Sequence, residues 1–233
     1  MSSSSRSPVG IVVLTCGDDA RRRWGSGPYR LAGQAVDLGA RPGRAEIDPL
    51  LADAARLVVA GDDAALAAVL VRLLRRERLD VELALLPAAD SVAATVWGVP
   101  TDPDEALALA REGTARAVPL VRDDRGGVVA GSHRVGTFTG AVYCDATQVC
   151  RGDAAGLVVH PDPVGGGVRV TVTGPRRWGG LRPGREAVAH GRAVQIGCRP
   201  AQVQRDGVTD ERPLERRSWY RHTEDWRLAL RAR

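Results

Sequence analysis

The sequence contains no lysine, and all 33 of its basic residues are arginine. Aromatic side chains are scarce, at 4% of the chain, with a single phenylalanine. The basic residues exceed the 28 acidic residues, which gives a formal net charge of +5. Because the arginines are scattered among the acidic residues, this charge is compatible with an anionic partner but does not identify one.

Long apolar runs are also missing. No segment reaches the roughly 20 consecutive apolar residues that a membrane-spanning helix needs. No apolar leader segment precedes Val9. We therefore expect a cytoplasmic protein, either free or peripheral at the inner face of the membrane.

Cysteine pairs with metal-ligand spacing are absent as well. The four cysteines, at positions 16, 144, 150 and 198, form no C-x-x-C pair. Cys144, Cys150 and His160 match no common zinc pattern, so we expect buried thiols in a reducing compartment and no metal site. The four histidines are widely separated and no G-x-S-x-G motif accompanies them, so we assign none a catalytic role.

What is present is typical of a globular protein. Hydrophobic residues make up 44% of the chain and charged residues 26%. A length of 233 residues allows one large domain or two modest ones. Residues 1–8 are rich in serine, and we expect them to form a flexible tail.

The first part of the chain has the pattern of alternating strands and helices. Continuous apolar runs at residues 10–15, 57–60 and 82–86 predict parallel strands that are covered on both faces. Residues 62–78 are rich in alanine and leucine and end in arginines, which predicts a helix. A second helix is predicted at residues 102–111, with an aspartate cap and a proline at its first position.

The second part of the chain has the pattern of short strands and turns. Gly126 and Gly127 mark the change, so we divide the chain into an α/β domain at 9–125 and an all-β domain at 126–233. Turn sequences DPVGGG and RDGV separate the apolar segments. Residues 226–231 could form a last strand or a helix that returns to the first domain, and their periodicity does not decide between the two. The predicted strands lie at residues 128–135, 140–144, 156–159, 168–172 and 193–197.

Four segments, in this order along the chain, resemble the motifs of diacylglycerol kinases and related lipid kinases. Residues 60–64 (AGDDA) resemble the family's G-G-D-G-T, and residues 87–91 (PAADS) resemble the start of its P-x-G-T-x-N-D-F-A. Residues 96–100 (VWGVP) are similar to its A-L-G-I-P, and residues 203–207 (VQRDG) to its late V-x-x-D-G-E hairpin. Together the segments cover most of the chain.

The resemblance implies a fold like that of diacylglycerol kinases and NAD kinases. In such a fold an N-terminal Rossmann-like α/β domain with a parallel sheet is followed by a C-terminal antiparallel β-sandwich. It also implies ATP, magnesium and a lipid alcohol as acceptor of the phosphate. The positions that the resemblance assigns to nucleotide binding are Ala60, Gly61, Asp62, Asp63, Ala64, Ala89, Asp90, Ser91, Asp206 and Gly207.

Several phosphate-binding positions of the family are changed in this chain. Glycines allow the backbone N–H groups to approach phosphate oxygens closely. Asp63 instead places a Cβ and a carboxylate where the third glycine of G-G-D-G-T would stand. The family's N-D pair falls on Ser91 and Val92, or one residue later, and only Gly17 remains of its opening N-P-x-x-G loop. We therefore expect phosphoryl transfer to be weakened or lost.

The replacements also have a structural explanation. A helix N-terminus carries unpaired N–H donors and partial positive charge, and aspartate or serine satisfies both well. Asp62 or Asp63 can cap the first long helix, and Asp90 or Ser91 can cap the next. Our hypothesis is that side-chain carboxylates occupy the place of a nucleotide phosphate. The alternatives are a working lipid kinase and a non-catalytic paralogue that binds a lipid or a partner protein.

Two segments combine arginine with aromatic residues, at 175–185 (PRRWGGLRPGR) and 216–222 (RRSWYRH). Such segments suit lipid head groups, membrane interfaces or nucleic acids, although arginine-rich loops are most often simply solvated. Because no nucleic-acid-binding motif is recognisable, we expect no nucleic-acid partner. A lipid or membrane surface and a second copy of the chain are the partners that the sequence allows.

Overall fold

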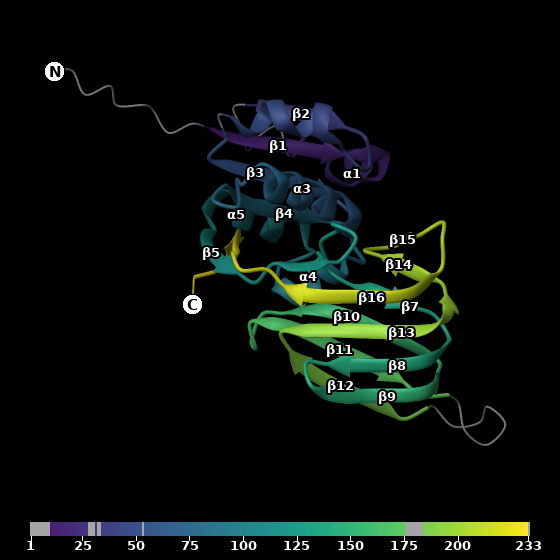
Figure 1. Ribbon diagram of the computed structural model, residues 1–233. Helices are drawn as coiled ribbons and strands as arrows, with labels where there is room; N and C mark the ends of the chain where they lie inside the picture. The colour runs from purple at the N-terminus through teal and green to yellow at the C-terminus, as the bar shows by residue number, and fades with distance from the viewer. Residues whose placement is uncertain (1–9, 28–30, 32–33, 53, 176–183, 233) are drawn as a thin grey trace. The chain divides into compact units, whose positions relative to one another are not determined.

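The structure is a computed structural model that describes residues 10–27, 31, 34–52, 54–175 and 184–232. The serine-rich tail and most of the segment 175–185 therefore lie outside the described residues. The chain divides into two compact units (Figure 1). Unit 1 comprises the described residues of Met1–Ala94, Gly98–Ala117 and Trp226–Arg233, and unit 2 comprises Thr95–Trp97 and Val118–Asp225.

Unit 1 is built on a six-stranded sheet in the order β2-β1-β3-β4-β17-β5. Neighbouring strands from β2 to β17 pair in parallel. All residues of β1, β3 and β4 after the first are buried, as expected of parallel strands covered on both faces. The strands are β1 (Ile11–Cys16), β2 (Gln34–Leu38), β3 (Arg56–Gly61), β4 (Glu82–Pro87), β5 (Thr114–Val118) and β17 (Trp226–Leu230).

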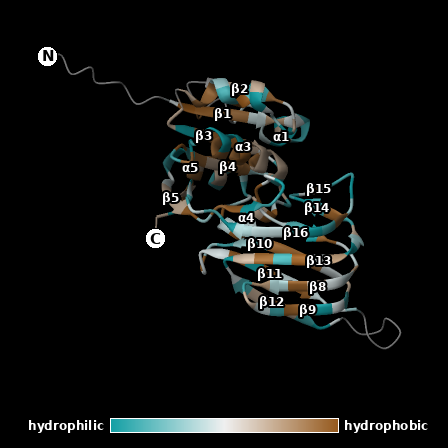
Figure 2. Cartoon of the chain, viewed as in Figure 1, coloured by the Kyte–Doolittle hydropathy of each residue, from teal (hydrophilic) through white to brown (hydrophobic). Residues whose placement is uncertain are grey.

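Capping residues set the starts of three helices. Asp62 accepts a hydrogen bond from the amide of Ala65, Ser91 from that of Ala94, and Asp102 from those of the residues after Pro103. Alanine and leucine on α3 pack toward the sheet, and β1 and α3 are largely brown in Figure 2. The described helices are α1 (Gly17–Trp24), α2 (Arg44–Ile47), the 3-10 helix η2 (Asp48–Leu51), α3 (Asp63–Arg75), α4 (Val92–Trp97) and α5 (Pro103–Glu112).

Unit 2 contains two antiparallel sheets. Sheet B has the strand order β6-β16-β13-β8-β9, and sheet C the order β12-β11-β10-β7-β14-β15. The strands of sheet B are β6 (Val121–Asp123), β8 (Phe138–Cys144), β9 (Thr147–Ala154), β13 (Ala193–Ala201) and β16 (Leu214–Arg221). Those of sheet C are β7 (His133–Val135), β10 (Gly156–Asp162), β11 (Gly167–Thr173), β12 (Glu186–Gly191), β14 (Val203–Arg205) and β15 (Val208–Thr209).

The two sheets share one hydrophobic core. In β10 and β11 every second residue is buried, which is the period-two pattern of sheets with one covered face. Trp219 of β16 in sheet B and Leu157 of β10 in sheet C belong to the same buried cluster. Valine is the commonest side chain in this cluster, as its preference for pleated, half-buried surfaces predicts.

Two boundaries differ from those that the sequence suggested, and one open assignment is decided. Strand β6 pairs with β16, so residues from Val118 onward lie in unit 2 rather than from 126 onward. Of the predicted strand 128–135, only His133–Val135 is a strand, because the amides of residues 130–132 donate to the carboxylate of Asp206 instead of to a neighbouring strand. The segment 226–231, which the sequence left open, contains strand β17 of unit 1.

Candidate functional site

The loop between β3 and α3 is the first candidate site. Gly61 ends β3, where an added Cβ would lie 2.8 Å from the Cβ of Ala65 and 3.2 Å from that of Cys16. The glycine is therefore required for close packing of α3 against β1. Asp62 is the N-cap of α3, with Oδ1 accepting a hydrogen bond of 2.8 Å from the amide of Ala65.

Asp63, the first residue of α3, reaches the start of the next helix. Its Oδ2 accepts hydrogen bonds from the backbone amides of Val92 at 2.9 Å and Ala93 at 3.1 Å. Its Oδ1 accepts a hydrogen bond of 2.5 Å from the hydroxyl of Ser91. The Ser91 oxygen in turn accepts from the amide of Ala94 at 2.9 Å. The carboxylate of one helix thus satisfies the N-terminus of another.

This arrangement has a clear electrostatic basis. The first amides of a helix carry partial positive charge and lack partners within the helix. Asp63 supplies both a negative charge and hydrogen-bond acceptors at the start of α4. A phosphate group would use the same two properties of a helix start. Of the predicted positions, the structure brings Asp63 and Ser91 into direct contact, with Asp62 capping α3 beside them.

The other predicted positions of this loop are placed differently. Ala60 and Ala64 are buried, so they contribute to the core of unit 1. Ala89 and Asp90 are exposed in the turn that joins β4 to α4. Of the two residues proposed as caps for α4, Ser91 therefore performs this role.

The end of β1 holds a cysteine beside this loop. Burial, together with the nearby carboxylates of Asp62 and Glu46, raises the pKa of Cys16 to about 12. The thiol is consequently neutral at physiological pH, and a neutral thiol is a poor nucleophile. Gly17 follows with a positive φ of 84°, and an added Cβ would lie 3.0 Å from that of Ala40. Both residues have structural reasons to be present.

The hairpin between β14 and β15 in unit 2 is the second candidate site. Asp206 and Gly207 form its turn with φ values of 45° and 89°, as a two-residue hairpin of the Asp-Gly type requires. The carboxylate of Asp206 is buried and accepts hydrogen bonds from three successive backbone amides. These come from Ala130 at 3.1 Å, Gly131 at 2.8 Å and Ser132 at 2.9 Å.

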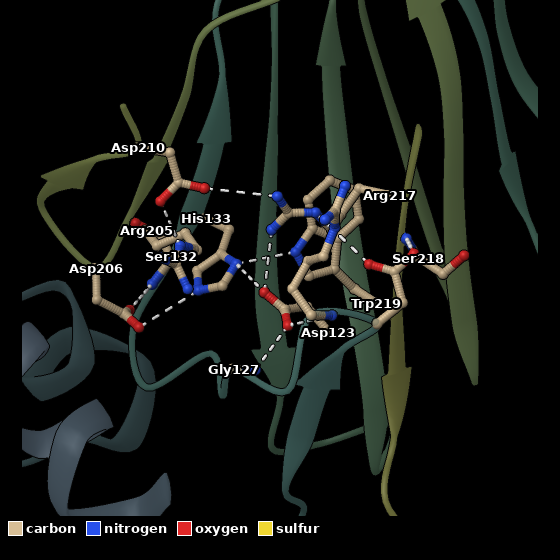
Figure 3. Close-up of polar contacts among 12 residues, drawn as sticks. Asp123, Gly127, Ser132, His133, Arg205, Asp206, Asp210, Arg217, Ser218 and Trp219 are labelled. Atoms are coloured by element: carbon tan, nitrogen blue, oxygen red, sulfur yellow. Dashed lines mark hydrogen bonds and ion pairs between the residues drawn. The ribbon is translucent and has the colours of Figure 1, made fainter. Parts of the chain in front are cut away.

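A histidine lies next to this carboxylate (Figure 3). His133 is 1% exposed, and its Nε2 lies 3.5 Å from Oδ2 of Asp206. Its Nδ1 accepts a hydrogen bond of 2.9 Å from the indole N–H of Trp219. Because an indole nitrogen can only donate, Nδ1 carries no proton, and the proton of the neutral ring is on Nε2, facing Asp206. The ring therefore joins the hairpin of sheet C to Trp219 of sheet B.

A buried ion pair continues the network on the other side of His133. Nη1 of Arg217 lies 3.1 Å from Oδ2 of Asp123, and both side chains are almost fully buried. Asp123 also accepts from the amides of Arg125 at 2.9 Å and Gly127 at 2.7 Å. The second terminal nitrogen of Arg217 lies 3.5 Å from Asp210. These bonds compensate for the cost of removing two charges from water.

This second network was not predicted from the sequence. Asp123 followed by glycines is a recognisable turn signal, because an aspartate accepts from amides two to four residues later. The alternation of residues 214–221 would have placed Arg217 and Trp219 on the buried face of a strand. His133 had no local signal, because its hydrogen-bond partner Trp219 lies 86 residues away and Asp206 belongs to a distant hairpin.

The described residues contain no group of three or more histidine, cysteine, aspartate or glutamate side chains placed to hold a metal ion. Cys144 and Cys150 are free thiols whose pKa values are raised by burial. The ring of His160 is bound through Nδ1 to the carbonyl of Gly131 at 2.9 Å. These residues do not form a metal centre, and the acceptors of Asp63 are engaged by Ser91 and α4. The loop as it stands does not fit a magnesium-bound triphosphate.

A parallel α/β sheet combined with two antiparallel sheets is the architecture of diacylglycerol kinases and NAD kinases. No protein-family model and no curated protein matches the sequence. Among the described residues, none of the helices has both the length and the apolar character needed to cross a membrane.

Solved structures similar to this chain come from two kinds of kinase. A diacylglycerol kinase from Bacillus anthracis strain Sterne is similar with a TM-score of 0.68 and 12% identity, over 95% of this chain and 96% of that chain. A putative diacylglycerol kinase from the same organism gives 0.67 and 12%, with the same coverage. An NAD kinase from Archaeoglobus fulgidus in complex with ATP gives 0.57 and 15%, over 94% and 92%. The chain therefore has the diacylglycerol kinase fold, as the sequence resemblance predicted.

Proposed function

We propose that this protein is a non-catalytic relative of the diacylglycerol kinases, which keeps their fold to bind a lipid or a partner protein. The supporting observation is the position of the Asp63 carboxylate. It accepts hydrogen bonds from Ser91, Val92 and Ala93, the donors that a phosphate would need at this loop. In this proposal the side chain has replaced the nucleotide.

The charge of Asp63 adds to the loss of these donors. Two unit charges about 4 Å apart repel each other by about 4 kcal/mol at an effective dielectric constant of 20. An affinity in the micromolar range corresponds to only about 8 kcal/mol. Repulsion of this size, together with donors already in use, is sufficient to abolish useful binding of ATP.

Asp206 supports the same proposal from unit 2. An ionised carboxylate has about four lone-pair positions. The amides of residues 130–132 use three of them, and Nε2 of His133 lies 3.5 Å from Oδ2. A buried carboxylate so engaged has little capacity left for a metal ion or for the proton of a substrate alcohol. The Asp-Gly hairpin is thus accounted for as structure.

The second candidate function is an ATP-dependent lipid kinase. It is favoured by the similarity of the fold to a diacylglycerol kinase and to an NAD kinase in complex with ATP. In that case Gly61, Asp62 and Asp63 would lie at the nucleotide, and Asp63 would have to release α4 when the nucleotide binds. The two candidates differ in whether the protein binds ATP at all.

Calorimetric titration of the whole chain with magnesium ATP separates the two candidates. We expect no measurable binding to the unchanged protein. The variant D63G removes the carboxylate and its Cβ, so we expect it to gain nucleotide affinity. D90G, in the exposed turn nearby, is the matched control and should gain none. Micromolar binding of ATP by the unchanged protein would contradict the proposal, and transfer of the phosphate to a lipid panel would then be measured.

A further inference from the structure

In strand β16, the side chains of the arginine-aromatic segment 216–222 point alternately to the two faces of sheet B. Arg217 and Trp219 are buried in the core network of unit 2. Successive side chains of a strand point to opposite faces of the sheet. Arg216, Ser218 and Tyr220 therefore lie on the outer face of sheet B. Along β13, Val194 and Ile196 are buried and Gln195 is exposed, and this alternation is visible as brown and teal segments in Figure 2.

Cross-strand pairing extends this face into rows. Directly paired residues of antiparallel strands have their side chains on the same face. Ser218 pairs with Gln195, Gln195 with Tyr143, and Tyr143 with Gln148, which makes a row across four strands. Tyr143 is 41% exposed, although tyrosine is one of the few aromatic residues in the chain. The centre of the face is thus an exposed ring between two amide side chains.

Arginines lie on both sides of the central row. On one side, Arg216 and Arg151 occupy the ends of a row whose middle positions are Gly197 and Ala141. On the other side, Arg122 pairs with Tyr220, and its guanidinium lies 6.0 Å from the centre of that ring. We call these three rows, on the outer face of sheet B, the platform.

The platform has a distinct charge. Its three rows contain arginines but no aspartate or glutamate. Among the carboxylates next to the rows, three already accept hydrogen bonds. Asp145 accepts from the amides of Arg192 at 3.1 Å and Ala193 at 2.9 Å. Asp124 accepts from the amide of Ser218 at 3.2 Å, and Asp153 accepts from the hydroxyl of Thr139 at 2.6 Å. The platform is therefore complementary to an anionic partner.

We propose that the platform binds single-stranded nucleic acid. The exposed Tyr143 and the half-buried Tyr220 can stack on bases, the glutamines can hydrogen-bond base edges, and the arginines can neutralise phosphates. Small residues, Gly197 and Ala141, leave room for a planar base between the arginines. The sequence contains no nucleic-acid-binding motif because the platform is assembled from separate strands. This inference is independent of the proposed function, since it concerns only sheet B.

The same chemistry fits a membrane less well. Peripheral binding of a flat face to anionic lipid needs either apolar side chains that enter the bilayer or a larger number of basic residues. The apolar side chains in the three rows, apart from the tyrosine rings, are alanines. The platform therefore suits a flexible strand of bases and phosphates.

Fluorescence anisotropy with a labelled oligouridylate and a labelled oligothymidylate tests the proposal on the full chain. We expect binding that weakens steeply as salt is raised. The variant Y143A should weaken binding by about five- to a hundredfold through the loss of a stacked base. Y143L keeps apolar volume without the aromatic face, and R216A removes one phosphate contact. The matched control is R169A, which removes an exposed arginine from β11 of sheet C.

Each outcome is decisive. Loss of binding in Y143A, Y143L and R216A, with R169A unchanged, supports the platform as the binding surface. Equal weakening by R169A and R216A would show attraction by net charge alone and would overturn the proposal. Absence of binding to either oligonucleotide at low salt would also overturn it, as would binding to phosphatidylserine vesicles without binding to oligonucleotides. Circular dichroism of each variant verifies that the exposed substitutions leave the fold intact.

Discussion

The carboxylates of Asp63 and Asp206 lie in different units, yet each accepts three hydrogen bonds. Asp63 receives a hydroxyl and two amides at the start of α4. Asp206 receives three amides from the loop before β7. Apart from the Ser91 hydroxyl, the donors are backbone amides without a partner in a regular helix or sheet, and unpaired donors of this kind are costly to bury. These residues stabilise the protein through the groups that they satisfy.

Replacement of Asp63 by alanine tests this role. We expect D63A to lower the free energy of unfolding by about 1 to 3 kcal/mol, because it leaves the amides of Val92 and Ala93 without their acceptor. Urea denaturation measures the change. The exposed neighbour Asp90 provides the control, since D90A should change the stability by less than about 0.5 kcal/mol. Equal effects of the two substitutions would show that the contact with α4 contributes nothing.

The ring of His160 makes the stability depend on pH. Burial lowers the pKa of His160 below its ordinary value of 6.5. The folded protein therefore takes up this proton at a lower pH than the unfolded chain does. The free energy of unfolding should therefore be highest above that value and fall as the pH drops toward the lowered pKa. Burial and Arg122 lower the pKa of His222 in the same direction.

Urea denaturation at a series of pH values measures this dependence. The variant H160Q keeps a side chain that can donate to the carbonyl of Gly131 but cannot be protonated in this range. We expect its stability to fall less between neutral and mildly acidic pH than that of the unchanged protein. The part of the pH dependence that comes from His222 should remain. A dependence of the same size in both proteins would show that the folded state does not resist protonation of His160.

At the scale of elements, β17 completes the sheet of unit 1. It pairs in parallel with β4 through Leu228 and Leu83, and both leucines are fully buried. The strand is short, so its contribution comes from burial of its apolar side chains rather than from its length. The neighbouring Arg227 is exposed and lies 3.8 Å from Glu82.

Substitutions in β17 separate the contribution of the buried Leu228 from that of the exposed ion pair of Arg227. We expect L228A to lower the free energy of unfolding by about 2 to 5 kcal/mol, because it leaves a cavity in a packed core. R227A removes only an exposed ion pair and should cost less than about 1 kcal/mol. Thermal and urea denaturation of both variants measure the difference. If L228A were as mild as R227A, β17 would not be an integral part of the sheet.

The helix starts could be predicted because their determinants are local. Asp62, Ser91 and Asp102 each accept from an amide two or three residues later, and such spacing is visible in the sequence. The contact of Asp63 with Ser91 spans 28 residues. It depends on how β3 and β4 lie side by side, which no local pattern contains. The loop at residues 128–132 was read as a strand for the same reason, since its partner Asp206 is distant.

At the scale of the whole molecule, the change from parallel to antiparallel structure could be predicted from the patterns of apolar residues. Continuous apolar runs identified β1, β3 and β4, and short apolar segments between turn sequences identified β8, β10, β11 and β13. The mostly polar strands β9 and β16 were not identified. The platform on the outer face of β16 and the buried network on its inner face were therefore not predicted. The candidate loops were predicted from the family resemblance. The contacts within these loops could be established only from the three-dimensional structure.

The strand order of unit 1 also determines when its sheet can form completely during synthesis. Strand β5 is hydrogen-bonded to β17 rather than to β4, although β5 follows directly after α5 and β17 follows all the other described strands. The ribosome delivers every strand of unit 2 before it delivers β17. Until β17 has been synthesised, the edge of β4 that faces away from β3 therefore has no strand beside it. Such an unpaired edge can pair with other chains. Nascent chains that stall or lose their final residues should be the species most prone to aggregation.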